Sequence, residues 1–134
     1  MGHRPVVEGE AQGYAFMTYG EVHKTVTSVG SALKAVGVEP GSAVGIYAVN
    51  SPQWMMAMKA TDFCGSMTVP LYDTFGANAV EYIIKHSGLK VIFVSADKLG
   101  TVAKVLPAVK DQVVQVVVWS SIPGDAVDAD LVEV

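Results

Sequence analysis

The sequence predicts an α/β fold in which a parallel sheet is flanked by helices. Short apolar runs alternate with stretches of helical periodicity along most of the chain. The apolar fraction of 51% lies at the top of the range usual for soluble domains (~45–50%), as expected where strands are buried on both faces. Strand–helix alternation favours right-handed crossovers and therefore parallel strands. The expected strands are 43–49, 67–71, 91–95 and 113–119.

The first helix is expected to begin after Thr18. Thr18 and Glu21 have the spacing of a capping box, in which each side chain satisfies a free backbone N–H. Apolar residues then recur at steps of three and four, and Gly37 is the expected left-handed cap. A coiled-coil seam has the same alternation, but the stretch is short, so a helix packed on a sheet is the preferred interpretation. The apolar stripe comprises Tyr19, Val22, Val26, Val29, Leu33 and Val36.

A second helix, 52–65, is apolar nearly all round. Ser51 is its expected N-cap, Pro52 takes the first helical position, and Gly65 closes it. A helix without a polar face is buried or covered by another part of the protein. We therefore expect either the remainder of a longer enzyme or a partner chain to cover 52–65.

The strand 67–71, which we expect to be buried, ends in a polar turn. Asp73, Thr74 and Gly76 are turn formers. Loops after parallel strands are where α/β proteins bind ligands. Tyr72, Asp73 and Thr74 are therefore weak site candidates, and turn formation is the preferred explanation of Asp73 and Thr74.

A third helix is expected at 77–87. Asn78 is its expected N-cap, with Glu81 as the carboxylate three residues on. A fourth helix follows the third strand and has Pro107 in its last turn.

The chain divides into three parts. The first has mixed composition and suits an arm or short edge strands, the second is the α/β part, and the third is an acidic loop or connection. Their bounds are 1–17, 18–120 and 121–134.

Composition excludes several classes of protein. A net charge of -4 gives no electrostatic case for binding nucleic acid. Cys64, the single cysteine, excludes an intrachain disulfide and fits a reducing compartment, and we expect it to be a small buried hydrophobe. The uncharged run 40–58 approaches the length of a membrane span, but a polar turn with Pro52 splits it. No secretory signal is visible at the start, so an intracellular protein is expected, either cytoplasmic or peripheral at an organelle membrane.

Six stretches, in chain order, carry a resemblance to a known family. Together they resemble the N-terminal part of long-chain acyl-CoA synthetases, members of the adenylate-forming (AMP-binding) superfamily. One position departs from the pattern: Gln53 stands where the family usually has glutamate, and a glutamine there still hydrogen-bonds. The stretches are FMTYGEV at 16–22, GSAVGIYAVN at 41–50, SPQWM at 51–55, VPLYDTFG at 69–76, AVEYIIKHSG at 79–88 and VIFVSADKL at 91–99.

The resemblance implies an enzyme that activates a fatty acid with ATP as an acyl-adenylate and then transfers the acyl group to CoA. Such an enzyme needs a Ser/Thr/Gly-rich loop ending in lysine for the phosphates, a carboxylate for Mg²⁺, and a lysine from a C-terminal lobe. The hydroxyl-rich stretch 25–31 lies within the first helix and lacks the lysine. No catalytic, cofactor-binding or metal-binding residue can be carried over. The chain is thus expected to be inactive by itself, with ATP, Mg²⁺ and CoA used by the full-length enzyme.

Other residues give weaker signals. Trp54 and Met58 are candidates for the wall of an acyl tunnel, although core packing is the preferred explanation. His3, His23 and His86 have no metal-ligand spacing.

Two further hypotheses belong to other classes. A truncated, non-catalytic relative could use the apolar helix 52–65 for interaction or dimerisation. A small flavodoxin-like binding domain would need a glycine-containing loop after the first strand, and residues 50–53 supply no glycine.

Overall fold

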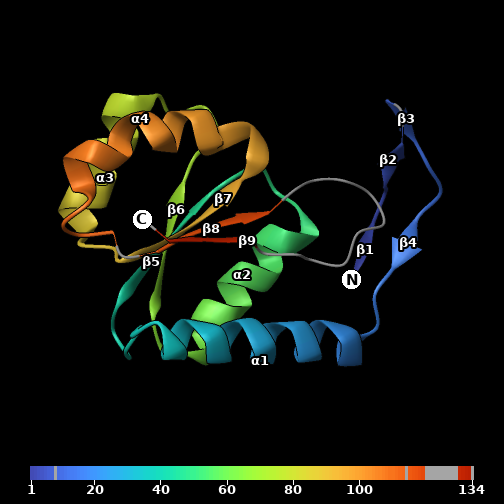
Figure 1. The fold of residues 1–134 in the computed structure, drawn as a ribbon. Coiled ribbons are helices and arrows are strands. Elements are labelled where there is room, and N and C mark those ends of the chain that lie inside the picture. The colour runs from blue at the N-terminus through green and yellow to red at the C-terminus, as the bar shows by residue number, and fades with distance from the viewer. Residues whose placement is uncertain (8, 114, 120–129, 134) are drawn as a thin grey trace.

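The structure, a computed structural model, describes residues 1–7, 9–113, 115–119 and 130–133, the last by backbone only. A five-stranded sheet with the order β6-β5-β7-β8-β9 lies between two helical layers (Figure 1). Strands β5 to β8 pair in parallel, which confirms the predicted fold class. The strand bounds are Ala43–Tyr47 (β5), Met67–Leu71 (β6), Val91–Ser95 (β7), Gln115–Trp119 (β8) and Asp130–Glu133 (β9).

Two helices cover each face of this sheet. Figure 1 shows α1 and α2 on one side and α3 and α4 on the other. A short 3₁₀ turn, η1 (Ala96–Lys98), joins β7 to α4. The helix bounds are Tyr19–Ala35 (α1), Pro52–Phe63 (α2), Ala77–Ser87 (α3) and Leu99–Val109 (α4).

The strand pleat divides the core into two clusters. Because successive side chains point to opposite faces, Tyr47 of β5 joins the cluster under α3 and α4, whereas Val44 and Ile46 join the one under α1 and α2. β7 divides in the same way, with Ile92 on the first face and Phe93 on the second. This two-sided burial explains why the strands read as continuous apolar runs.

The predicted caps of the first two helices are confirmed. The Glu21 carboxylate accepts from the Thr18 N–H at 2.7 Å, and the Thr18 hydroxyl accepts from the Glu21 N–H at 3.2 Å. Ser51 accepts from the Trp54 N–H at 3.1 Å, with Pro52 in the first turn. Gly37, just after α1, has φ of 86°, a conformation that glycine adopts at little cost.

The capping box predicts a pH effect on stability. The hydrogen bond from the Thr18 N–H lowers the pKa of Glu21 from its ordinary 4.5. A lowered folded-state pKa means that the carboxylate stabilises the fold above the ordinary pKa and loses that effect as the pH falls through the folded value. We expect Glu21→Gln to unfold at a lower temperature than wild type at about pH 7, and the difference to shrink toward about pH 3. Thermal unfolding followed by circular dichroism measures this, and a constant difference would contradict it.

Three expectations for local structure are wrong. The N-cap of α3 is Gly76 rather than Asn78, and it has no side-chain hydrogen bond. Met67–Leu71 is an edge strand instead of a buried one, and Met67 is 59% exposed. Pro70 carried that signal, because proline within a sheet is confined to edges and bulges. At the end of the chain, Asp130–Glu133 pairs antiparallel with β8 instead of forming a loop, while residues 120–129 lie outside the described residues.

The predicted stripe of α1 is only partly buried. Val26 and Leu33 are buried in the core, but Tyr19 is 91% exposed. Tyr19 lies at the first turn of α1, next to the arm. The arm formed by residues 1–17 is a narrow ribbon that stands apart from the sheet (Figure 1). Its strands are Gly2–His3 (β1), Val6–Val7 (β2), Glu10–Ala11 (β3) and Ala15–Phe16 (β4).

Candidate functional site at the carboxyl edge of the sheet

The strand order places a candidate site at the carboxyl ends of β5 and β7. The connections that follow these neighbouring strands run to opposite faces of the sheet. The chain continues from β5 into α2 on one face, and from β7 into η1 and α4 on the other. Open α/β sheets bind ligands at such a switch point. The turn after β6, which holds three predicted candidates, lies at the same edge because β6 is parallel to β5.

The turn after β6 is ordered by its own contacts. The Phe75 N–H donates to the Tyr72 carbonyl at 2.9 Å, and the rings of these residues meet edge to face with centroids 5.2 Å apart. Tyr72 is 67% exposed, Thr74 is exposed, and Asp73 is half-buried. This geometry supports turn formation as the role of Asp73 and Thr74, and a ligand-binding role for the three candidates stays a prediction.

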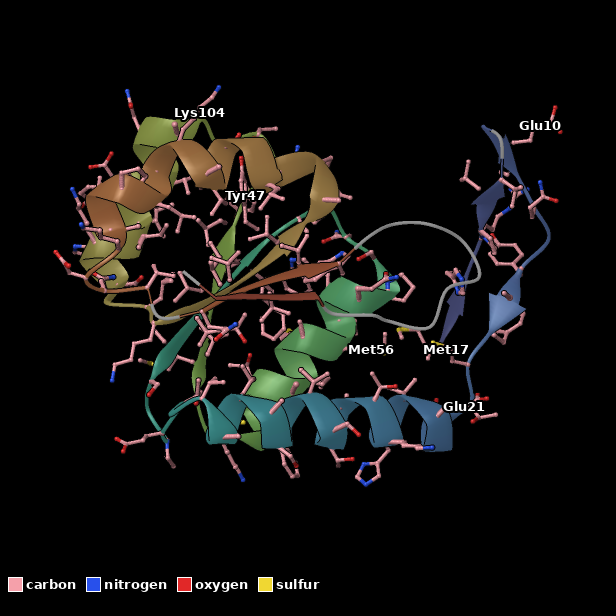
Figure 2. All side chains as sticks on the ribbon, in the orientation of Figure 1. Glu10, Met17, Glu21, Tyr47, Met56 and Lys104 are labelled. Atoms are coloured by element: carbon pink, nitrogen blue, oxygen red, sulfur yellow. The ribbon has the colours of Figure 1, made fainter. Side chains whose placement is uncertain are left out.

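Tyr47 fixes this turn to the centre of the sheet, a role that the sequence did not reveal. It is the last residue of β5 and only 1% exposed. Its hydroxyl donates to the Phe75 carbonyl at 2.5 Å, from the side of the sheet that faces α4 (Figure 2). The contact is partly buried, and a carbonyl shielded from water costs free energy when it loses its donor. Tyr47 therefore holds the turn after β6 in one position relative to β5.

The loop after β7 satisfies its charges locally. The Ser95 hydroxyl, and then the Lys98 ammonium, lower the pKa of Asp97 from its ordinary value. The Lys98 Nζ lies 3.2 Å from the Asp97 Oδ2 and forms an ion pair with it. The carboxylate is thus stabilised in its charged form, which does not suit a general acid near neutral pH.

Trp54 and Met58 lie on the other face of the sheet. Both are half-buried against the cluster under α1 and α2, whereas Phe75 of the turn packs against the opposite cluster. The structure therefore does not bring the two groups of candidates together. A hollow of about 30 Å³ is lined in part by Met56, and neither Trp54 nor Met58 is among the residues that line it. Figure 2 shows where Met56 lies on α2. Their packing supports a core role, and the acyl-tunnel role stays a prediction.

The described residues form no cluster that could bind a metal ion, and their single cysteine does not have the surroundings of a reactive thiol. In the ranges that the structure covers, no three His, Cys, Asp or Glu side chains gather where they could hold a metal. Cys64 is buried, donates to the Gly30 carbonyl at 3.1 Å, and has its pKa raised by burial. This agrees with the prediction of a small buried hydrophobe. His86 is exposed and stacks on Tyr82, with centroids 5.4 Å apart.

The strand order and the helices on both faces of the sheet define a doubly wound α/β protein. In this protein, Tyr47 of β5 holds the turn after the neighbouring strand β6 in place. The family model described as AMP-binding enzyme matches residues 1–132, and the chain belongs to this family. Long chain acyl-CoA synthetase 4 of Arabidopsis thaliana is 42% identical over 107 residues, which are 80% of this chain and 16% of that protein. Long chain acyl-CoA synthetase 1 of the same plant is 46% identical over 99 residues, covering 74% and 15%.

Solved structures agree on the fold. Acetoacetyl-CoA synthetase from Streptomyces lividans superposes with a TM-score of 0.76 at 26% identity, over 87% of this chain and 19% of that one. A putative long-chain-fatty-acid CoA ligase from Rhodopseudomonas palustris superposes with a TM-score of 0.71 at 20% identity. The match covers 94% of this chain and 30% of that one. The chain thus spans about one sixth of the length of the curated relatives described above. The resemblance seen in the sequence is confirmed.

Proposed function

We propose that this chain is the N-terminal scaffold of a long-chain fatty acid–CoA ligase. The observation that carries the proposal is the 46% identity to a long-chain acyl-CoA synthetase over 99 residues, which make up only 15% of that protein. In the proposed reaction, ATP activates the fatty acid carboxylate as an acyl-adenylate with release of pyrophosphate. The CoA thiolate then displaces AMP.

The chain's own contribution in this proposal is structural. Tyr47 and the turn after β6 give the carboxyl edge a fixed shape, against which residues outside this chain build the ATP and acyl sites. The donor groups described here do not fit ATP phosphates or Mg²⁺, since the sequence has no Ser/Thr/Gly-rich loop ending in lysine. We therefore assign ATP, Mg²⁺ and CoA to later parts of the enzyme.

The remainder of the enzyme is also the partner proposed for the helix 52–65. Most of α2 is already covered by α1 and the sheet, and Met56, Ala57, Ala60 and Thr61 are buried. Met55 at 42% and Phe63 at 45% remain exposed, which leaves a smaller surface than an uncovered helix. The same two residues are what a dimerisation module would use, so sedimentation of the isolated chain separates these alternatives.

The proposed enzyme is intracellular, in the cytoplasm or peripheral at an organelle membrane. Among the described residues, no helix combines the length and the apolar character needed to cross a membrane.

We expect the purified chain to form no acyl-CoA thioester. The test supplies ATP, Mg²⁺, CoA and a long-chain fatty acid, with Arabidopsis long chain acyl-CoA synthetase 4 as the positive control. The physical reason is that the groups which stabilise the charge of the adenylation transition state lie outside the chain. Circular dichroism confirms that the sample is folded, and ATP-dependent thioester formation above the no-enzyme background would refute the proposal.

A further inference from the structure

We infer that Pro70 closes the outer edge of the sheet against pairing with a second copy of this chain. β6 is the end strand of the order β6-β5-β7-β8-β9, so within the described ranges no strand pairs with its outer side. An end strand presents free backbone N–H and C=O groups, which are a template for another strand. The inference goes beyond the proposed ligase scaffold and does not depend on it.

The ladder between β5 and β6 shows which backbone groups of β6 are free. The Met67 N–H donates inward, to the Ser42 carbonyl at 2.8 Å. Alternate residues of β6 bond to β5 in this way along a continuous parallel register. Thr68 and Pro70 lie between them, so their backbone groups point outward. Because proline has no N–H, the inward ladder loses no bond, and the outer edge of β6 is left with the Thr68 N–H as its donor.

Proline at this outward position disrupts the pairing of two β6 strands. A two-fold axis through Val69 would place Thr68 of one copy opposite Pro70 of the other, as a closed dimer requires. In an antiparallel pair, opposite residues that face each other exchange both N–H···O bonds. Pro70 donates none of these bonds, so half of them are missing. The proline ring also occupies the space in which the hydrogen would point, beside the carbonyl of the other copy.

The described part of the chain gives β6 no other edge protection. Natural edge strands carry charges, bulges or proline, or are covered. Met67–Leu71 contains no charged residue, and its register with β5 has no bulge. Met67 is 59% exposed and Pro70 is exposed, so the edge is open to solvent at both residues. Pro70 is thus what separates this stretch from the uncharged, proline-free segments that associate through their edges.

Analytical ultracentrifugation of the isolated chain tests the inference with two matched variants. Pro70→Thr restores an outward N–H on a residue of high strand propensity. Pro70→Lys restores the same N–H but adds an exposed charge, which protects an edge. We expect Pro70→Thr to self-associate with a dissociation constant at least about tenfold below that of wild type, because two copies regain the missing hydrogen bonds. Pro70→Lys should sediment as wild type does.

Amide exchange followed by NMR identifies the surface that pairs. In Pro70→Thr, we expect exchange of the Thr68 amide to slow at least about tenfold as the protein concentration is raised, since pairing suppresses its exposure. In wild type, the same amide should exchange at a rate independent of concentration. Circular dichroism checks that each variant is folded, and Pro70→Val, which restores the same N–H, replaces Pro70→Thr if threonine unfolds the chain.

Three results would overturn the inference. A folded Pro70→Thr that sediments as wild type does shows that the edge stays closed without proline. Equal association of Pro70→Thr and Pro70→Lys shows that the contact does not form along this edge. Protection of the wild-type Thr68 amide that rises with concentration shows that the edge accepts a strand despite Pro70. The last measurement uses no substitution, so it decides the matter even where the variants do not fold.

Discussion

Replacing Tyr47 by alanine is expected to destabilise the fold by about 3–5 kcal/mol, the cost typical of removing a buried aromatic ring. That is a large part of the roughly 5–15 kcal/mol by which domains are stable. The ring is 1% exposed within the cluster under α3 and α4, and its hydroxyl donates to the Phe75 carbonyl. Chemical denaturation of wild type and Tyr47→Ala measures the loss.

Tyr47→Phe separates the hydroxyl from the ring. It keeps the packing and leaves the Phe75 carbonyl without this donor. Because the contact is only partly buried, we expect a loss of about 1 kcal/mol, the lower end of the cost of a buried unpaired group. We also expect the amides of the turn at residues 72–76 to exchange faster in this variant than in wild type, and this increase to be larger than any increase in the sheet. A Tyr47→Phe variant as stable as wild type, with an unchanged turn, would contradict the role assigned to this hydroxyl.

Valine at Gly45 is expected to cost about 3 kcal/mol or more, at the upper end of overpacking effects. β5 lies between β6 and β7, and a Cβ at Gly45 would lie 2.9 Å from Leu89, 3.1 Å from Ile92 and 3.4 Å from Leu71. All three neighbours are buried, so none can move into solvent. The midpoint of urea denaturation gives the measurement.

Gly76→Ala is the matched control for that substitution. Gly76 has φ of -82°, and a Cβ there would meet nothing within 4 Å. The change should therefore cost about 1 kcal/mol or less, far less than the substitution at Gly45, because it disturbs no packing and only exchanges glycine for alanine, a poorer N-cap residue, at the start of α3. Equal losses at Gly45 and Gly76 would show that the crowding around β5 does not decide the outcome.

Elements defined by local pattern were predictable from the sequence. The strands Met67–Leu71 and Val91–Ser95 and the helix Ala77–Ser87 have the bounds that periodicity and turn residues predicted. Apolar periodicity and capping residues act over a few positions, so a short window contains the information.

Contacts between distant segments were not predictable in this way. The bond from Tyr47 to Phe75 spans 28 residues, and nothing in either stretch indicates it. The edge position of β6 depends on the strand order, for which Pro70 was the only local signal. The candidate site residues lie on two different faces of the sheet, and the sequence did not show this. Helical and strand periodicity predict which side of an element is buried, but they do not specify which layer covers it.

The first measurement for the proposed ligase scaffold is the reading frame that follows Val134 in the transcript. We expect the frame to continue into a Ser/Thr/Gly-rich loop ending in lysine, which would supply the phosphate contacts that this chain lacks. A stop codon directly after Val134 would contradict the scaffold role in a ligase. It would leave a binding or dimerisation role as the function to test.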